Sequence, residues 1–292
     1  MADRIGLGWR GELAAGIFTH LDHIDLLEII ADDYFDADAR ALRPLATLAS
    51  QVPITLHGVS MGLAGSEAVE SRRMENMARL VEVLRPESWS EHLAFVRAGG
   101  IEIGHLAAPP RTLRNIAAAI ANIECASAIV GCAPWLENIA TLINPPGCQI
   151  EEATWTCSII EGSGAGMLLD LHNLYANALN FGEKPELLMM RFPLHRVRAV
   201  HLSGGKWIPE PRGTDAGETA RHRLLDDHVH DVPADVFGLL SLLAQHAPQP
   251  LDVIIERDGN FPDFRSLLEQ LGSARAALAR GRAAALQMKA AA

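Results

Sequence analysis

The stretch Gly166-Met-Leu-Leu-Asp-Leu-His-Asn173 decides the fold of this chain, which has 292 residues. After Gly166 come three apolar residues, which predict a short strand that is buried on both faces. Asp170, His172 and Asn173 follow at the point where such a strand ends. Metal-binding side chains at the end of a buried strand are typical of a functional site, so the stretch indicates an α/β protein with its site at the strand ends.

Three other stretches have the same form, a short β-rich run that ends in His or Glu. They are Pro53-Ile-Thr-Leu-His57-Gly58, Val197-Arg-Ala-Val-His201-Leu-Ser-Gly204 and Leu251-Asp-Val-Ile-Ile-Glu256. One such strand has a simple explanation, a polar residue that finds a hydrogen-bond partner at the strand end. Four strands that all end in metal-binding or acid–base side chains favour one shared site.

Strands and helical patterns alternate along the chain, without a Gly/Ser-rich linker that would divide it. Helices with one apolar face are indicated around residues 74–84, 113–123, 150–160 and 236–243. Eight strands in about 250 residues match the length of a TIM (β/α)8 barrel, which we therefore predict as the α/β fold of this chain. The eight candidate strands are Arg4–Trp9, Asp25–Ile30, Pro53–Gly58, Ser88–Phe95, Pro134–Ala140, Gly166–Leu171, Val197–Ser203 and Leu251–Arg257.

A doubly wound open sheet is the alternative fold, but its usual sequence signal is absent. Gly6-Leu-Gly8 is followed by Trp9-Arg10 and not by the remaining glycine of a dinucleotide-binding loop. Gly204-Gly205-Lys206 lacks the upstream glycine and the following Ser or Thr of a phosphate-binding loop. The sequence therefore favours the barrel.

Composition and charge narrow the class of protein. Hydrophobic residues make up 49% of the chain, enough for a large core, and the formal net charge is −11. A negative charge argues against a nucleic acid or an anionic membrane as the main partner. The N-terminus has no signal-peptide pattern and no apolar run approaches the length of a membrane span, so we expect a cytoplasmic protein. The cysteines form no Cys-x-x-Cys pair, which predicts reduced thiols.

A barrel would bring the metal-binding residues together, because active sites of this fold lie at the C-terminal ends of the strands. A loop after the His201 strand, Asp226-Asp-His-Val-His230, would add an Asp and a His that point the same way. Imidazoles and carboxylates without a thiolate favour iron, manganese or zinc. The candidates exceed what one ion needs, so we predict two or three ions, with Glu137 or Asp170 as a bridge. The strand ends supply Glu28, His57, Glu91, His92, Glu137, Asn138, Asp170, His172, Asn173, His201, Glu256 and Asp258.

Three positions have alternative interpretations. Glu28 could be a buried carboxylate paired with Arg4 or Arg10 instead of a site residue. His172 and His230 each lie close to a better-placed candidate, and either could orient a ligand through its second ring nitrogen.

At these residues the chain resembles the multinuclear non-heme iron-dependent oxidative enzymes, a family whose best-known member acts in methanobactin biosynthesis. Single motifs are weak signals, but their order and spacing cover most of the chain and are specific together. The motifs are Gly6-Leu-Gly-Trp-Arg10, Leu26-Leu-Glu28, Leu56-His-Gly58, Glu91-His-Leu93, Leu136-Glu-Asn138, Leu168-Leu-Asp-Leu-His-Asn173, Val200-His-Leu202, Asp226-Asp-His-Val-His230 and Ile255-Glu256.

The resemblance implies a single-domain, xylose-isomerase-like TIM barrel with two or three iron ions, as Fe2+ and Fe3+. We place the barrel at residues 1–272 and an Ala-rich C-terminal helix or tail at residues 273–292. His230 and Asp258, which neighbour the inferred ligands, are predicted to be catalytic. The iron ligands that the resemblance implies are His57, His92, Glu137, Asp170, Asn173, His201, Asp226, His228 and Glu256.

Four positions depart from the commonest pattern of the family. Glu91 stands where Asp is usual, His172 where Asn is usual, Asp231 where Pro is usual and Arg257 where Trp is usual. None of these changes removes an inferred ligand. They lie beside the metal sites, so they affect the expected substrate and reaction outcome more than the metal centre.

For function, the resemblance implies an O2-dependent oxidoreductase that modifies cysteine residues of a ribosomally synthesised precursor peptide. It also implies a separate partner protein that recognises the leader of that peptide. Two other hypotheses remain open from the residues alone. One is a zinc- or manganese-dependent isomerase or phosphoester hydrolase on a similar barrel, which metal identity and redox activity would distinguish. The other is a non-catalytic metal-binding scaffold, which a site saturated by protein ligands would favour.

Overall fold

The structure, a computed structural model, describes residues 2–210 and 222–291. Eight parallel strands form a closed barrel in the order β1-β12-β9-β8-β7-β4-β3-β2. All eight predicted strands are present, so the barrel prediction is confirmed and the open sheet is wrong. The barrel strands are β1 (Arg4–Gly8), β2 (Leu26–Ile30), β3 (Ile54–Gly58), β4 (Ser88–His92), β7 (Trp135–Glu137), β8 (Gly166–Asp170), β9 (Val197–Leu202) and β12 (Asp252–Ile255).

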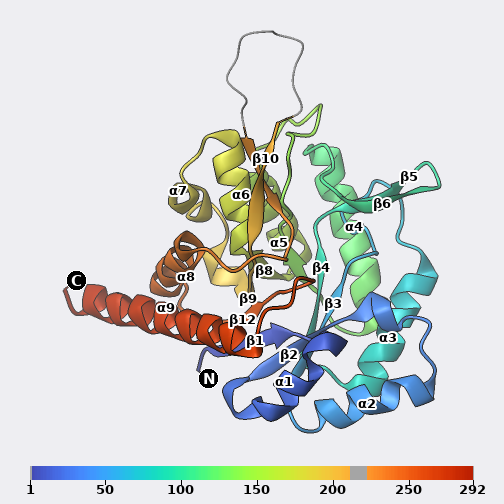
Figure 1. Ribbon diagram of the computed structural model, residues 1–292. Coiled ribbons are helices and arrows are strands. Elements are labelled where there is room, and N and C mark those ends of the chain that lie inside the picture. The colour runs from blue at the N-terminus through green and yellow to red at the C-terminus, as the bar shows by residue number, and fades with distance from the viewer. Residues whose placement is uncertain (1, 211–221, 292) are drawn as a thin grey trace.

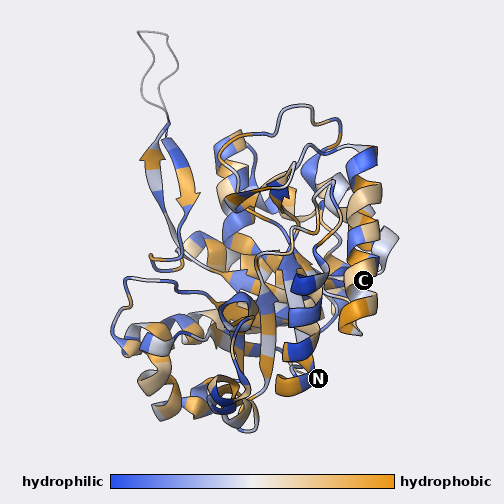
Figure 2. Cartoon of the chain, turned by 90° about the vertical axis from the view of Figure 1, so that its right-hand side faces the viewer, coloured by the Kyte–Doolittle hydropathy of each residue, from blue (hydrophilic) through white to orange (hydrophobic). Residues whose placement is uncertain are grey.

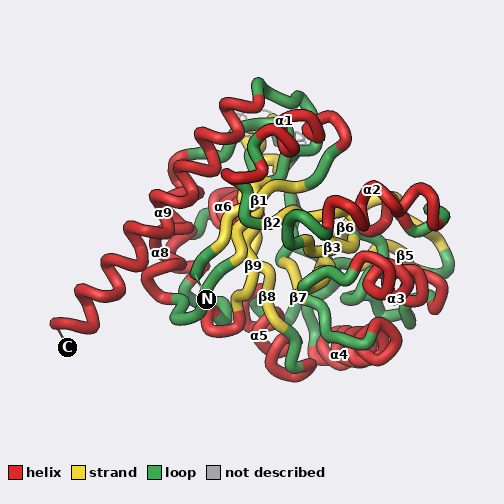
Figure 3. The backbone as a smooth tube through the Cα atoms, turned by 90° about the horizontal axis from the view of Figure 1, so that it is seen from below, coloured by secondary structure: helices red, strands yellow, loops and turns green. Residues whose placement is uncertain are grey.

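Helices surround the barrel, and Figure 3 shows the strands in the middle with the helices outside them. The four predicted helices correspond to α3, α4, α5 and α8. Helix α3 shows why the pattern works, because Met74, Met77, Leu80 and Leu84 recur every three or four residues and are all buried. The helices of the outer layer are α1 (Ala14–Thr19), α2 (Ala39–Ala49), α3 (Ser71–Leu84), α4 (Leu113–Val130), α5 (Glu152–Ser163), α6 (Leu171–Phe181), α7 (Pro185–Met189), α8 (Ala234–His246) and α9 (Phe264–Ala291).

Helix α6 begins immediately after β8, and the sequence did not reveal this. Asp170 is its N-cap, and its carboxylate accepts a hydrogen bond of 2.7 Å from the backbone N–H of Asn173. His172 and Asn173, which we expected at the end of the strand, therefore lie in the first turn of a helix. The turn brings both side chains over the mouth of the barrel, where they are buried.

Two hairpins rise at the C-terminal end of the barrel, and neither was predicted. One consists of β5 (Phe95–Ala98) and β6 (Ile101–Ala107), the other of β10 (Gly205–Pro209) and β11 (His222–Asp226). Figure 1 shows both at the upper end of the molecule, and Figure 2 shows the second projecting from the body. Asp226 thus ends a strand, so the expectation that it belongs to a loop is wrong.

The last helix, α9, runs without a break through the boundary that we placed between residues 272 and 273. Ala274, Ala277 and Leu278 are buried, and α9 packs along α8. The guanidinium group of Arg282 binds the carboxylate of Asp3 at 2.6 Å and the backbone carbonyl group of Ala244 at 3.0 Å. Part of the Ala-rich segment therefore belongs to the outer layer of the barrel.

Among the described residues, helix α4 is long and apolar enough to cross a membrane by length and composition alone. It packs between α3 and α5, with Ala119, Ile123 and Ala126 fully buried. A core helix passes the same test of length and composition, so this single helix is weak evidence for a membrane protein.

Candidate metal centre

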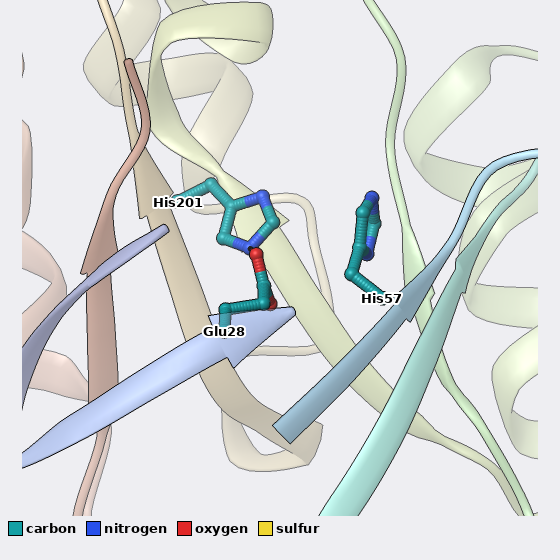
Figure 4. Close-up of side chains that lie close together, drawn as sticks. All are labelled: Glu28, His57 and His201. Carbon is teal, nitrogen blue, oxygen red and sulfur yellow. Dashed lines mark hydrogen bonds and ion pairs between the residues drawn. The ribbon is translucent and has the colours of Figure 1, made fainter. Parts of the chain in front are cut away.

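The strand ends place seven titratable side chains inside the mouth of the barrel. Each is at most 8% exposed, although His and carboxylate groups are rarely so buried without a partner. Figure 4 shows three of them, Glu28, His57 and His201, which come from three different strands and point into the barrel interior. The seven residues are Glu28, His57, His92, Glu137, Asp170, His201 and Glu256.

His201 lies between three carboxylates. Its Nδ1 atom is 3.1 Å from Oε1 of Glu137 and 3.1 Å from Oε2 of Glu256. Its Nε2 atom is 3.0 Å from the carboxylate of Glu28. The alternative in which Glu28 pairs with an arginine is wrong, because Arg4 binds Asp252 and Glu87, and Arg10 binds Asp258.

Glu137 is the carboxylate that connects the cluster. While its Oε1 faces His201, its Oε2 lies 3.3 Å from Nε2 of His57 and 3.1 Å from Nε2 of His92. Two oxygens that face different imidazoles are the arrangement that a bridging carboxylate requires. Three groups of potential ligand atoms, each within 4.8 Å of one another, share these residues. They are Glu28/His57/His201, His57/His92/Glu137 and Glu137/Asp170/His201/Glu256.

Several buried polar atoms of this region lack a hydrogen-bond partner among the described residues. An unpaired buried polar atom costs about 1–3 kcal/mol, so a cluster of them indicates a missing common partner. Their nitrogen and oxygen donors, with no sulfur, fit a first-row metal ion such as iron, manganese or zinc. Oδ2 of Asp170, Nε2 of His172 and Oδ1 of Asn173 have no hydrogen-bond or ion-pair partner among the described residues. Oε2 of Glu137, Nε2 of His228 and Oε2 of Glu256 also lack a hydrogen bond there, but each lies at ion-pair distance from an opposite group.

Surrounding groups orient the imidazoles toward this point. Nδ1 of His57 hydrogen-bonds to Oγ of Ser90 at 2.8 Å, and Nδ1 of His92 lies 3.3 Å from the carbonyl oxygen of Gly58. Both histidines therefore present Nε2 to the centre. We did not predict Ser90, although it stands two residues before His92 on the same face of β4, which is the signal that a strand provides.

A second set of residues lies beside the barrel cluster, where β11 ends. Oδ1 of Asp226 accepts hydrogen bonds from Nδ1 of His172 at 2.6 Å and from Oγ of Ser203 at 2.9 Å. Its Oδ2 lies 2.7 Å from Nε2 of His228, whose Nδ1 is 3.0 Å from Oδ2 of Asp258. His228 has a positive φ of 54°, a conformation that costs energy in a residue other than glycine. We call Asn173, Asp226 and His228 the hairpin set.

Of the nine predicted metal ligands, the structure brings six into the close groups around Glu137. These six are His57, His92, Glu137, Asp170, His201 and Glu256. The hairpin set lies next to them, since its members line one cleft together with His92. His230 is farther out, exposed, with Nδ1 2.8 Å from Oδ1 of Asp227.

The four residues that we expected to depart from the family pattern all have structural partners, and the carboxylate of Glu91 accepts a hydrogen bond of 3.2 Å from the backbone N–H of Met61. Arg257 and Asp231, two of the departing positions, pair with each other at 3.1 Å. The third, His172, holds Asp226. The changes at 231 and 257 therefore stabilise the segment after β12, and the change at 172 acts on a predicted ligand.

Burial and close charges shift the protonation of the cluster. Burial raises the pKa of Asp170 well above its usual range, and the nearby carboxylates of Asp226 and Glu137 raise it further. Burial would lower the pKa of His92, but Glu137 and Glu91 raise it to about 9. Burial would likewise raise the pKa of Glu256, yet His201 and His228 hold it well below its usual range. The raised pKa values of Asp170 and His92 favour bound protons at two positions where a metal cation would also be stabilised.

A cleft of about 170 Å3 lies beside the candidate metal centre. His92, Asn173, Asp226 and His228 line its polar side.

Comparison with known proteins shows to which family this chain is similar. The model of the family described as "RiPP precursor modification enzyme MbnB/TglH/ChrH" matches residues 4–279, where RiPP denotes a ribosomally synthesised and post-translationally modified peptide. A UPF0276 protein of Streptomyces avermitilis is 32% identical over 280 residues, which are 94% of this chain and 54% of that protein. A UPF0276 protein of Bordetella parapertussis is 31% identical over 282 residues, which are 97% of this chain and 95% of that protein. The chain thus spans about half the length of the first relative and nearly all of the second.

Solved structures of low sequence identity share the fold. An L-ribulose 3-epimerase matches with a TM-score of 0.60 at 15% identity, over 99% of this chain and 97% of that one. A xylose isomerase domain containing protein from Salmonella typhimurium matches with a TM-score of 0.59 at 13% identity, over 94% of this chain and 97% of that one. At such identities the likeness establishes a xylose-isomerase-like barrel and nothing about the reaction.

Proposed function

Because the chain belongs to the MbnB/TglH/ChrH family of RiPP precursor modification enzymes, we propose that it is a multinuclear non-heme iron oxidase. In this proposal it uses O2 as co-substrate to modify cysteine residues of a ribosomally synthesised precursor peptide. The family match supports an enzyme that acts on a precursor peptide. The proposal goes further than the family match in three respects: the metal is iron, the co-substrate is O2 and the modified residue is a cysteine.

The observation that carries the proposal is the convergence of three buried imidazoles, those of His57, His92 and His201, on the two oxygens of Glu137. One ion would take His57, His92 and Glu137, and a second would take Glu137, Asp170, His201 and Glu256. A third would take the hairpin set. Iron bound there would supply one-electron chemistry with O2 and would lower the pKa of a substrate thiol.

The side chains around the ions do the positioning. Ser90 and the carbonyl group of Gly58 fix two imidazole rings, and His172 with Ser203 fixes the carboxylate of Asp226. Such outer partners typically change metal affinity or activity by about 10–100-fold when removed. The side chains of the cluster around Glu137 are buried inside the barrel, and charge interactions are stronger in such a low-dielectric interior than in water.

Two residues at the mouth are proposed to carry protons. Asp258 hydrogen-bonds to His228 and pairs with Arg10, and its side chain is 43% exposed, so it connects the hairpin set with solvent. His230 is exposed and is held by Asp227. Neither side chain lines the cleft, so in this proposal each would exchange protons with solvent beside it and not through direct contact with the cleft.

The proposed substrate is a thiol because the site itself offers none. The predicted ligands are imidazole, carboxylate and amide groups, and the four cysteines, all free, do not line the cleft. A soft thiolate ligand would therefore have to come from the substrate. A separate partner protein that presents the leader of the precursor peptide completes the proposal.

Metal analysis of anaerobically purified protein, followed by Mössbauer spectroscopy, tests the metal assignment. A cysteine-containing precursor peptide should then produce a thiolate-to-ferric charge-transfer band, and its Cys→Ser form should not. O2 consumption should require both the cysteine and reduced iron. If the zinc-loaded protein turned over equally well without O2, the isomerase or hydrolase hypothesis would replace this one.

A further inference from the structure

Five aliphatic side chains form one wall of the cleft that lies beside the candidate metal centre. Leu106 comes from β6, Ile139 and Leu142 come from the segment after β7, and Leu224 and Leu225 come from β11. We call these five residues the aliphatic wall. His92, Asn173, Asp226 and His228 line the same cleft, so it combines polar with apolar lining residues.

Part of the aliphatic wall is left uncovered by the described residues. Ile139 and Leu224 are buried, but Leu106 and Leu225 are partly exposed, and Leu142 is 36% exposed. A ligand that covers this surface gains the free energy of removing apolar area from water. The five wall residues are all aliphatic, so a charged group that lies against them gains no ionic partner from them.

The aliphatic wall is held in place by two asparagines of helix α6. Asn177 donates a hydrogen bond of 2.9 Å to the carbonyl group of Ile139 and accepts one of 2.7 Å from the backbone N–H of Thr141. Asn180 likewise donates a hydrogen bond of 3.0 Å to the carbonyl group of Leu224 and accepts one of 2.7 Å from the backbone N–H of the same residue. The two asparagines are three residues apart and lie on one face of the helix. The same helix carries His172 and Asn173, so the metal centre and the wall share one rigid support.

The size of the cleft limits what it can take. An engineered protein cavity of about 150 Å3 holds one benzene molecule, and this cleft measures about 170 Å3. It therefore accommodates groups of side-chain size and not a folded segment. A thiol that reaches the polar side would bring its neighbouring side chain against the aliphatic wall.

We propose that the aliphatic wall is a specificity subsite that binds an aliphatic side chain, such as Leu, Val or Met, next to the modified cysteine of the substrate. The inference rests on the proposed function for its occupant, a cysteine-containing peptide. The enzyme then selects among the cysteines of a precursor by the residue beside each one. A neighbour such as Asp or Lys is disfavoured because its charge would lose hydration against the aliphatic wall without gaining an ionic partner from the wall residues.

Binding of short peptides to the iron-loaded protein under anaerobic conditions tests the subsite without turnover. The probes are capped hexapeptides with one cysteine, in which the residue before or after it is Leu, Val, Gly, Asp or Lys. Isothermal titration calorimetry should show at least one position where Leu binds about 10-fold more tightly than Gly or Asp. Equal affinities at both positions, or no measurable binding of any peptide, would overturn the inference.

Two neighbouring residues offer a matched pair of variants. Leu142→Lys places a charge on the wall, and Ile143→Lys places the same charge on the next residue, which is 70% exposed and does not line the cleft. The first should reduce the preference for Leu over Asp to about 3-fold or less, and the second should leave it unchanged. Leu225→Ala, on the hairpin, should weaken binding of the Leu peptide alone, which gives an independent check. If both lysine variants behave alike, the wall does not select the neighbour.

The outcomes separate this inference from the proposed function. If the Leu preference is present but no peptide stimulates O2 consumption, the subsite stands and the oxidase proposal fails. If all cysteine peptides are oxidised at equal rates and bind equally, the oxidase proposal stands and the subsite is overturned.

Discussion

The cluster around Glu137 and the hairpin set are built from the same kinds of side chain but on different supports. Six residues of the first come from barrel strands or directly follow them, and all are buried. Asp226 and His228 of the second stand at the end of a projecting hairpin and in the segment after it, with side chains 14% and 19% exposed. Barrel strands are fixed by hydrogen bonds on both sides, whereas hairpin ends and loops open more easily. We infer that the two sets differ in how firmly they hold metal.

Glu137→Ala should have the largest effect, because both oxygens of this carboxylate face predicted ligands. The variant should lose more than one equivalent of metal, measured by elemental analysis after anaerobic loading. Glu152→Ala, which removes a carboxylate outside the cluster, should keep the full complement. Loss of one equivalent or less from Glu137→Ala would show that the carboxylate does not bridge.

The double variant Asp226→Ala, His228→Ala should remove one equivalent of metal and leave the others. The reason is that its two residues contact each other and the segment after β12, while the cluster around Glu137 keeps its own ligands. Metal titration followed by Mössbauer spectroscopy would count the sites. Loss of all metal, or unfolding, would mean that the hairpin set supports the whole centre.

The eight barrel strands could be predicted from the sequence, because runs such as that in 166–170 are apolar throughout and end in a polar residue. The same rule predicted that six of the candidate ligands converge, since in a parallel barrel every strand end reaches the same rim. The contact between Glu28 and His201 joins residues 173 positions apart, and only barrel closure brings them together.

Other features had no signal that sequence reasoning could use. Helix α6 starts within the ligand motif, so its first turn looked like the end of β8. The hairpin strands are short and mix polar with apolar residues, and their pairing depends on contacts with the barrel rim. The aliphatic wall therefore appeared only in three dimensions, since its members come from three separate segments.

His172→Asn should weaken the hairpin set without affecting the cluster around Glu137. The imidazole holds Oδ1 of Asp226 at 2.6 Å, which leaves Oδ2 toward His228. We expect about 10–100-fold weaker binding of the most labile ion, measured by chelator competition. Ser203→Ala removes the second hydrogen bond to the same oxygen and should have a smaller effect. Equal loss of all ions in His172→Asn would contradict the separation of the two sets.

The smallest expected effect concerns Glu152, a carboxylate in the outer layer that titrates independently of either metal set. Burial raises the pKa of Glu152 to about 7, although Arg111 and a hydrogen bond from Asn177 oppose the shift. A carboxyl group whose folded pKa is raised stabilises the fold fully below its unfolded pKa of about 4.3, and this stabilisation is lost as pH rises through about 7.

Glu152→Gln should therefore flatten the pH dependence of stability between about pH 4.3 and about pH 7. Since the side chain is partly exposed, we expect a difference of roughly 1–2 kcal/mol and not the full value of the shift. Urea unfolding at a series of pH values would measure it, and subtraction from the parent curve cancels the titration of the metal ligands, which both proteins share. Glu151→Gln, which changes the exposed neighbour that pairs with Arg191, is the matched control. Identical pH profiles for the parent and Glu152→Gln would mean that Glu152 is ionised in the folded protein at the same pH as in the unfolded chain.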